Sequence, residues 1–228
     1  MPTTEWVVAP VVSGGDIGNP TNFAAEALQK TFDIVIEQDG LLEYHLGMQV
    51  EHPEQLEAMI NWTSLDKHME WRQRPEHDPA AAISAPVFGE GGFMRHVDFE
   101  PYHQSVKAFT KPVTQVATFF YDGVPPEGIL DGVHKFFEVL RREKVPGALS
   151  SAAGITYEEV EFEDGKGKAV VLVIGWRSIE DHLAFKKTKL YEDSIPLLRT
   201  DEAAKVDVHH VKFVMHGGKA LADSKLAH

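Results

Sequence analysis

No cysteine occurs among the 228 residues, which excludes disulfide bonds, thiolate metal sites and a cysteine nucleophile. Basic residues are few, because 22 Lys and Arg stand against 35 Asp and Glu and give a formal net charge of −13. Proteins that bind nucleic acid usually present a basic surface. We therefore expect no nucleic-acid partner.

Long hydrophobic runs are also missing. The densest apolar stretch, Ala169 to Ile174, is far too short to cross a bilayer, and the first residues do not join a basic segment to an apolar one as a signal peptide does. With an apolar fraction of 43%, the chain can still bury one large core or two small ones. We expect a cytoplasmic, globular protein with no membrane partner.

Two kinds of binding motif are absent as well. The segment Ser13-Gly14-Gly15-Asp16 follows the first expected strand but matches neither glycine-rich phosphate fingerprint, so we expect no nucleotide cofactor. Twelve histidines raise the question of a metal ion. None has the spacing of a histidine and carboxylate metal motif, and the adjacent His209 and His210 would point to opposite faces of a strand. We expect no metal site.

An internal repeat is the most informative feature that is present. Its clearest members recur 114 positions later, in the pairs Trp62 and Trp176, Ser64 and Ser178, and His68 and His182. The same offset aligns about residues 40–100 with 154–214 without a gap. Before this stretch a gap is needed, and we place residues 6–12 opposite 113–119. The pattern predicts a tandem duplication, with units at residues 1–108 and 113–216 and a flexible tail at 217–228.

Each repeat predicts the element order βαββαβ. In the first copy we expect strands at 6–12, 41–50, 56–62 and 93–99, a helix opened by Asn19-Pro20, and a second helix capped by Ser64. In the second copy we expect a hairpin whose turn at 164–167 joins strands 157–163 and 168–176, a helix capped by Ser178, and a strand at 206–214. Residues 100–111 would form a connector.

The expected fold class follows from this order. A βαββαβ unit is ferredoxin-like and carries its helices on one face of an antiparallel sheet, so the other face must be buried. Two such sheets facing each other would enclose a barrel. We therefore expect an α+β protein in which a duplicated ferredoxin-like unit forms an intramolecular dimeric α+β barrel.

These residues resemble the dimeric α+β barrel superfamily, and within it the antibiotic-biosynthesis monooxygenase family and the stress-responsive α/β-barrel family. The resemblance rests on three segments of the chain: Trp62 with Ser64 and His68, Arg74-Pro75-Glu76-His77, and Val97-Asp98-Phe99. It covers nearly the whole chain in two copies. The families include oxygenases, cyclases and haem-degrading enzymes, so the resemblance implies a fold without selecting one reaction.

One site residue follows from the resemblance to the stress-responsive family. In its polyketide cyclases, a His-Pro-x-His motif supplies the catalytic histidine from its last position, which matches His77. Arg74 replaces the first histidine of that motif, and Trp71 stands where the family has a catalytic tyrosine. The residue 114 positions after His77 is Tyr191. We take His77 as a candidate general base and Tyr191 as a candidate donor to an oxyanion.

The repeated histidines and tryptophans admit two interpretations each. His68 and His182 lie on the apolar stripe of a helix, beside Met69 and Leu183, so they either pack in the core or take part in catalysis. The aromatic and histidine side chains that would contact substrate, or else pack in the core, are Trp62, Trp71, Trp176, His96 and His210. Strand parity leaves open whether the last two face the barrel interior.

The resemblance implies a cofactor-independent monooxygenase-like enzyme that deprotonates a phenolic or enolisable polyketide-type molecule with the help of a histidine. A polyketide cyclase, a haem-binding protein with His68, His77 or His182 as axial ligand, and a non-catalytic stress protein that binds small molecules are the alternatives. We expect no dissociable cofactor. Because one chain would contain both halves of the barrel, we expect a monomeric pseudo-dimer or a homodimer.

Overall fold

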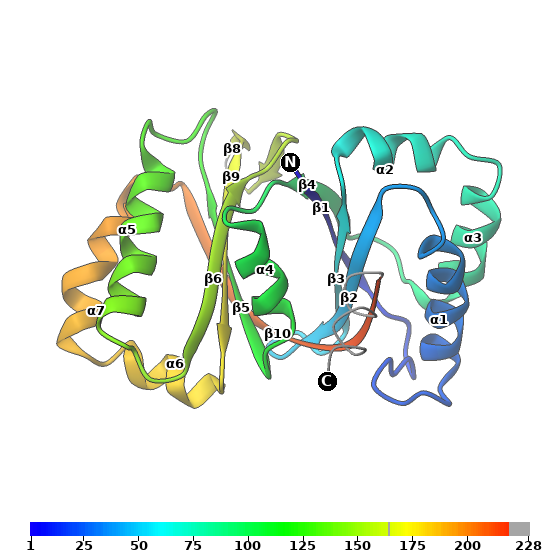
Figure 1. Cartoon of the computed structure of the whole chain (residues 1–228), viewed down its shortest axis with the longest axis horizontal. Coiled ribbons are helices and arrows are strands. Elements are labelled where there is room, and N and C mark those ends of the chain that lie inside the picture. Colours follow the sequence, from blue (N-terminus) through cyan, green and yellow to red (C-terminus); the bar gives the residue numbers. More distant parts are fainter. Residues whose placement is uncertain (164, 219–228) are drawn as a thin grey trace. The chain divides into compact units, whose positions relative to one another are not determined.

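The computed structural model describes residues 1–163 and 165–218, and these fall into two units (Figure 1). The first unit contains Met1–His96 and the segment that begins at Lys212, and the second contains Val97–Val211. Gly217 and Gly218 end the last strand, and the rest of the expected tail, residues 219–228, lies outside the described residues.

The first unit has the expected element order with one additional helix. Its elements are β1 (Thr3–Pro10), α1 (Phe23–Val35), β2 (Leu41–Gln49), β3 (Gln55–Trp62), α2 (Leu65–Arg72), α3 (His77–Ser84), the 3₁₀ turn η1 (Ala85–Val87) and β4 (Phe93–Val97). The strand order β4-β1-β3-β2 is that of a ferredoxin-like sheet. Helices α1 and α3 pack against each other beside this sheet (Figure 1).

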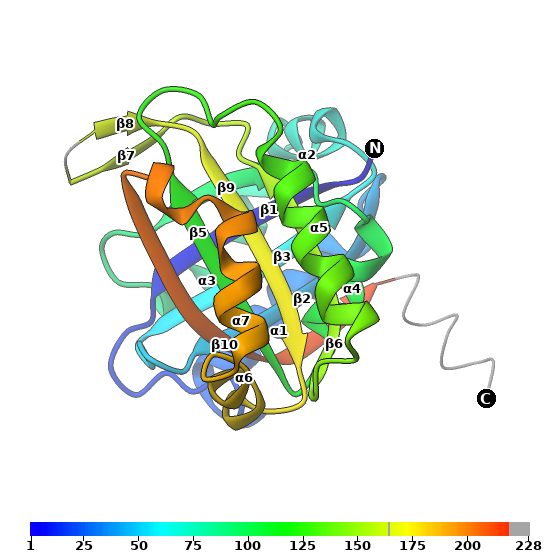
Figure 2. The ribbon, with the colours of Figure 1, turned by 90° about the vertical axis from the view of Figure 1, so that its left-hand side faces the viewer.

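The second unit repeats this arrangement. Its elements are α4 (Tyr102–Phe109), β5 (Val113–Phe120), α5 (Ile129–Arg142), β6 (Ala148–Ile155), β7 (Val160–Phe162), β8 (Gly165–Gly167), β9 (Ala169–Trp176), α6 (Ile179–Phe185), α7 (Lys189–Ser194), η2 (Ile195–Leu198), η3 (Thr200–Glu202) and β10 (Lys205–Gly218). The strand order is β10-β5-β9-β6. Helices α5 and α7 lie on the same side of these strands (Figure 2).

The predicted serine caps are confirmed in both units. The Ser64 side chain accepts a hydrogen bond from the backbone N–H of Lys67, and Ser178 does the same for Asp181. The predicted start of the first helix was wrong, because Asn22 caps α1 by accepting from the N–H of Ala24. The Asn19 side chain instead accepts from the N–H of Thr21, which forms a local turn ahead of the helix.

The predicted hairpin of the second copy was also wrong. Strand β9 pairs with β6, and residues 160–162 pair only with β8 in a separate two-stranded sheet. Strand β6 contains small residues such as Gly154, which are uncommon in strands, so its residue types do not indicate a strand. Their size is required, because a Cβ on Gly154 would lie 2.3 Å from the carbonyl oxygen of Asp98.

Two further expectations need correction. Residues 102–109 of the expected connector form helix α4, which packs on β6 and β9 and buries Phe109. The expected apolar stripes included Met69 and Leu183, yet these side chains are 39% and 47% exposed. The buried stripes instead pair His68 with Trp71 and His182 with Phe185 at a spacing of three residues.

Candidate active site in the first unit

A cavity of about 190 Å³ lies in the first unit between the sheet and helices α1, α2 and α3. Its floor comes from β1, β2 and β3, with side chains such as Leu56 and Ile60, and its walls are largely apolar. Three titratable side chains line it, namely Glu5 from β1, His68 from α2 and His77 from α3. An apolar cavity with a few convergent polar groups is the usual form of a small-molecule site.

The Glu5 carboxyl group is held by two neighbours on the helix-covered face of the sheet. Its Oε2 accepts a hydrogen bond from Nε1 of Trp62 at 3.1 Å and lies 3.3 Å from Nε2 of His68. The residue is only 9% exposed. Burial therefore raises the pKa of Glu5 above its ordinary value of 4.5, and the hydrogen bond from Trp62 offsets part of this shift.

His68 links Glu5 to a second histidine. Its Nδ1 lies 2.7 Å from Nε2 of His96 on β4, and its ring stacks on Trp62 with centroids 5.1 Å apart. Both ring nitrogens of His68 are thus in hydrogen-bonding contacts within the protein. His96 is 4% exposed and lies behind His68, so it does not line the cavity.

His77 approaches the cavity from the other side. It is the first residue of α3, its side chain is 26% exposed, and its ring packs edge-on against Trp71 with centroids 5.5 Å apart. The Nδ1 atom lies 3.0 Å from Oδ1 of the exposed Asp78. His77 therefore joins the cavity to solvent.

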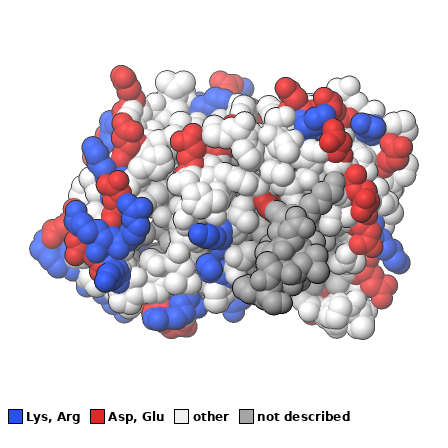
Figure 3. Space-filling model, in the orientation of Figure 1, with Lys and Arg blue, Asp and Glu red and all other residues white. Residues whose placement is uncertain are grey.

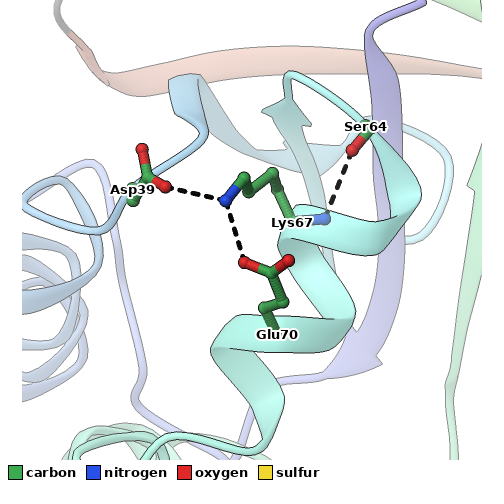
Figure 4. A network of polar contacts seen from close by, with 4 residues as sticks. All are labelled: Asp39, Ser64, Lys67 and Glu70. Carbon is green, nitrogen blue, oxygen red and sulfur yellow. Dashed lines mark hydrogen bonds and ion pairs between the residues drawn. The ribbon is translucent and has the colours of Figure 1, made fainter.

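The start of α2, which carries His68, is fixed by a polar network (Figure 4). Nζ of Lys67 contacts Oδ2 of Asp39 at 2.8 Å and Oε2 of Glu70 at 2.9 Å, and these hydrogen bonds raise the pKa of Lys67 to about 12. Gly40 lies directly under this turn with a φ of +89°, and a Cβ there would lie 2.5 Å from Cβ of Lys67. The network holds α2 against the turn that precedes β2.

The second unit contains a smaller cavity of about 90 Å³ at the corresponding place. It is lined by four residues that the repeat aligns with the first cavity or its neighbours: Trp176, His182, Phe185 and Tyr191. His182 Nδ1 lies 2.8 Å from Nε2 of His210, and the His182 ring stacks on Trp176 at 5.0 Å. The repeated Trp and His residues therefore build the same frame in both units.

The two cavities differ at the residue that the tryptophan contacts. Nε1 of Trp176 donates to Oε1 of Gln115 at 3.0 Å, so a neutral amide stands where the first unit has Glu5. Strand register establishes the equivalence, because Thr3 pairs with Trp62 and Val113 pairs with Trp176.

The alignment of residues 6–12 with 113–119 was therefore three residues out of register. Since a shift by an odd number exchanges the two faces of a strand, Glu5 was not recognised as a site residue. A search of the expected neighbouring strand for a side chain that could accept the N–H of each tryptophan could have found Glu5.

The predicted site residues thus fall into three groups. Trp62, Trp71, His68 and His77 meet at the first cavity, and Trp176, His182 and Tyr191 meet at the second. His96 and His210 lie behind these cavities against the helix histidines, which answers the question of strand parity.

The described residues form no metal centre, and the first cavity is small for haem. Among residues 1–163 and 165–218, no group of three His, Asp or Glu side chains is arranged to hold a metal ion. An axial haem ligand needs a free ring nitrogen, whereas both nitrogens of His68 have partners. A cavity of about 190 Å³ is below the roughly 300–1,000 Å³ of pockets for drug-sized ligands, so it suits a molecule smaller than these, whereas haem is no smaller than a drug-sized ligand. The first cavity does not fit haem.

On the face shown in Figure 3, Lys and Arg side chains lie beside Asp and Glu side chains at both ends of the picture. Within the part of the chain that the structure describes, no helix is long and apolar enough to span a membrane.

No protein-family model and no curated protein matches the chain. Solved structures do match it. An anthrone oxidase-like protein aligns with a TM-score of 0.65 at 10% identity, over 95% of this chain and 93% of that one. A monooxygenase candidate from Fusobacterium nucleatum aligns with a TM-score of 0.61 at 11% identity, over 96% and 94%. A chlorite dismutase candidate aligns with a TM-score of 0.52 at 10% identity, over 94% and 95%.

At identities this low, the structural similarity establishes the fold and leaves the activity open. The expected fold class is confirmed, since these neighbours are proteins of the same architecture. The chain has the α+β fold of the dimeric α+β barrels, as the monooxygenase-like and chlorite dismutase-like proteins do.

Proposed function

We propose that the chain is a cofactor-independent, monooxygenase-like enzyme that acts on a phenolic or enolisable, polyketide-type small molecule in the cavity of the first unit. The observation that carries this proposal is the meeting of one carboxyl group and two imidazoles at a largely apolar cavity. Apolar walls exclude bulk water and strengthen the interactions of a developing charge. The likeness to an anthrone oxidase-like protein supports the same class of substrate.

The reaction begins with histidine-assisted deprotonation. A proton leaves an acidic O–H or C–H bond of the substrate, and the electron pair of that bond remains on the substrate. The resulting anion then reduces dioxygen: for a methylene group, one oxygen atom enters the product as a carbonyl and the other leaves as water with the two hydrogens. His77 suits the deprotonation step, because its ring lines the cavity and also reaches solvent, to which it can pass the proton.

The second cavity would serve a different purpose. Tyr191 takes the place of His77 there, and burial raises the pKa of its phenol above the ordinary 10.0, so this side chain stays protonated and can donate a hydrogen bond. We propose Tyr191 as a donor to a ligand oxygen. Proton removal is assigned to the first unit.

Oxygen uptake with a panel of anthrones, naphthols and simpler phenols tests the proposal. We expect uptake with at least one of these classes, and a decrease in kcat/KM of about 10²-fold or more in His77→Ala. The melting temperature should change little, because His77 is partly exposed. The matched variant Tyr191→Phe should keep most of the turnover. If the wild-type protein oxidises none of these compounds, or if haem titration gives a Soret band shifted from that of free haem, the proposed function is wrong.

A further inference from the structure

We infer that Glu5 is the group that first accepts the substrate proton, that His77 then passes this proton to solvent, and that His68 and His96 are positioning residues that hold the Glu5 carboxylate. The inference rests on the proposed function and names a residue for its first step. It depends on the geometry of the first cavity and on the difference between the two units at this position.

The geometry leaves one Glu5 oxygen for the substrate. Both contacts of the carboxyl group, from Trp62 and from His68, fall on Oε2. Within the described part of the chain, Oε1 is therefore available to a molecule in the cavity that Glu5 lines. In the first step, the substrate O–H or C–H bond breaks, its electron pair stays on the substrate, and Oε1 gains the proton to give a neutral carboxylic acid.

The two histidines favour the ionised carboxylate before this step. To donate from Nε2 to Glu5, a neutral His68 must leave Nδ1 unprotonated, and Nδ1 can then accept from Nε2–H of His96 at 2.7 Å. With Glu5 ionised and both rings neutral, the chain of contacts thus selects one tautomer of each ring and orients the carboxylate. Neither histidine has to contact substrate for this purpose.

Burial supports the assignment from another direction. The charged groups around Glu5 are His96 on β4, Arg72 on α2 and His77 on α3, together with His68 on α2. Their attraction is smaller than the effect of burial, so the pKa of Glu5 lies above 4.5. It is thus closer to the pKa of the substrate group whose proton Glu5 must accept.

The second unit supplies a natural comparison. The same frame of tryptophan and two histidines surrounds Gln115, an amide that cannot accept a proton at neutral pH. The frame is therefore compatible with folding whether the central residue is an acid or an amide. Glu5→Gln reproduces in the first unit a residue that the second unit already accommodates.

Steady-state kinetics over a range of pH provides the first test. We expect Glu5→Gln to lower kcat about 10²-fold or more, to leave KM within about threefold, and to abolish the acidic limb of the pH profile. Glu5→Asp should keep that limb at a reduced rate. His68→Gln and His96→Gln should move the limb and lower kcat more than they change KM. If Glu5→Gln keeps the wild-type rate and limb while His77→Ala loses turnover, the inference is overturned and the proposed function stands.

A probe that needs no turnover tests Glu5 even if no compound is oxidised. Bound 4-nitrophenol reports its own ionisation by its visible absorption. A pH indicator in weak buffer near pH 6.5 measures the protons released for each phenolate formed on binding. In the wild-type protein we expect less than one proton released per phenolate, because Glu5 takes up the proton, and in Glu5→Gln we expect one, because the amide cannot accept it. Equal proton release in the two proteins overturns the assignment of Glu5. If no phenolic compound is oxidised but proton release differs as expected, the proposed oxygenation fails and proton acceptance by Glu5 is retained.

Discussion

Glu5 of β1 and Gln115 of β5 occupy equivalent positions in the two units. Each accepts the indole N–H of a tryptophan, Glu5 at 3.1 Å from Trp62 and Gln115 at 3.0 Å from Trp176. Among the residues that line the two described cavities, Glu5 is the single carboxylic acid. The two units therefore share a frame, and a one-residue difference places a carboxyl group only in the lining of the first cavity.

Loss of the tryptophan hydrogen bond should make the decrease in unfolding free energy depend on pH in the first unit but not in the second. In Trp62→Phe the Glu5 carboxylate loses a donor that lowers its pKa, so this pKa should rise further. Because the lost bond stabilised the ionised form, the decrease in unfolding free energy should be larger above the Glu5 pKa than below it, by about 1–3 kcal/mol. Urea denaturation at several pH values measures this difference.

Trp176→Phe is the matched control for that measurement. It removes the same indole from an equally buried position, but its partner Gln115 does not titrate. We expect a comparable loss of packing that does not vary with pH. A pH dependence of equal size in both variants would mean that Glu5 is not the group responsible.

Buried His45 should make the protein sensitive to acid. His45 of β2 is fully buried, its Nδ1 lies 2.9 Å from Nδ1 of His216, and burial followed by repulsion from His216 lowers its pKa from 6.5 to about 3. Since the folded pKa is depressed, this stability is present above pH 6.5 and is lost as the pH falls towards about 3. The full effect is about 5 kcal/mol, since each pKa unit corresponds to about 1.4 kcal/mol.

His45→Gln should flatten the decrease in unfolding free energy between pH 6.5 and about 3, as measured by chemical denaturation. His52→Gln serves as the control, because the His52 side chain is 60% exposed and should leave the slope unchanged. An undiminished slope in His45→Gln would show that other groups cause the acid sensitivity.

Gly40 should tolerate no side chain, since it combines a φ of +89° with a Cβ position 2.5 Å from Cβ of Lys67. Gly40→Ala should therefore lose about 1–3 kcal/mol from backbone strain and a similar amount from the clash. Gly14→Ala isolates the first cost, because Gly14 has a φ of +86° but nothing within 4 Å of a Cβ. Equal melting temperatures for the two variants would contradict the role of the turn under α2.

The fold was largely predictable, and particular residues show why. Ser64 and Ser178 cap helices through contacts with residues three positions away, so a local pattern carries that information. The repeat offset from residue 40 onward also predicted that His77 and Tyr191 would take corresponding places, and each lines the cavity of its own unit. Strand β6 was missed, because its small residues are required by close packing that no local pattern reports.

Spacing along the chain predicted the repeat, the element order of the first unit apart from α3, the serine caps of α2 and α6, and the aromatic frame. That Glu5 lines the cavity and that His96 lies behind His68 depends on tertiary contacts. A cavity is lined by segments far apart in the chain, and the face a strand residue occupies depends on register. An error of three residues in aligning β1 with β5 was enough to hide Glu5, the residue that distinguishes the two units.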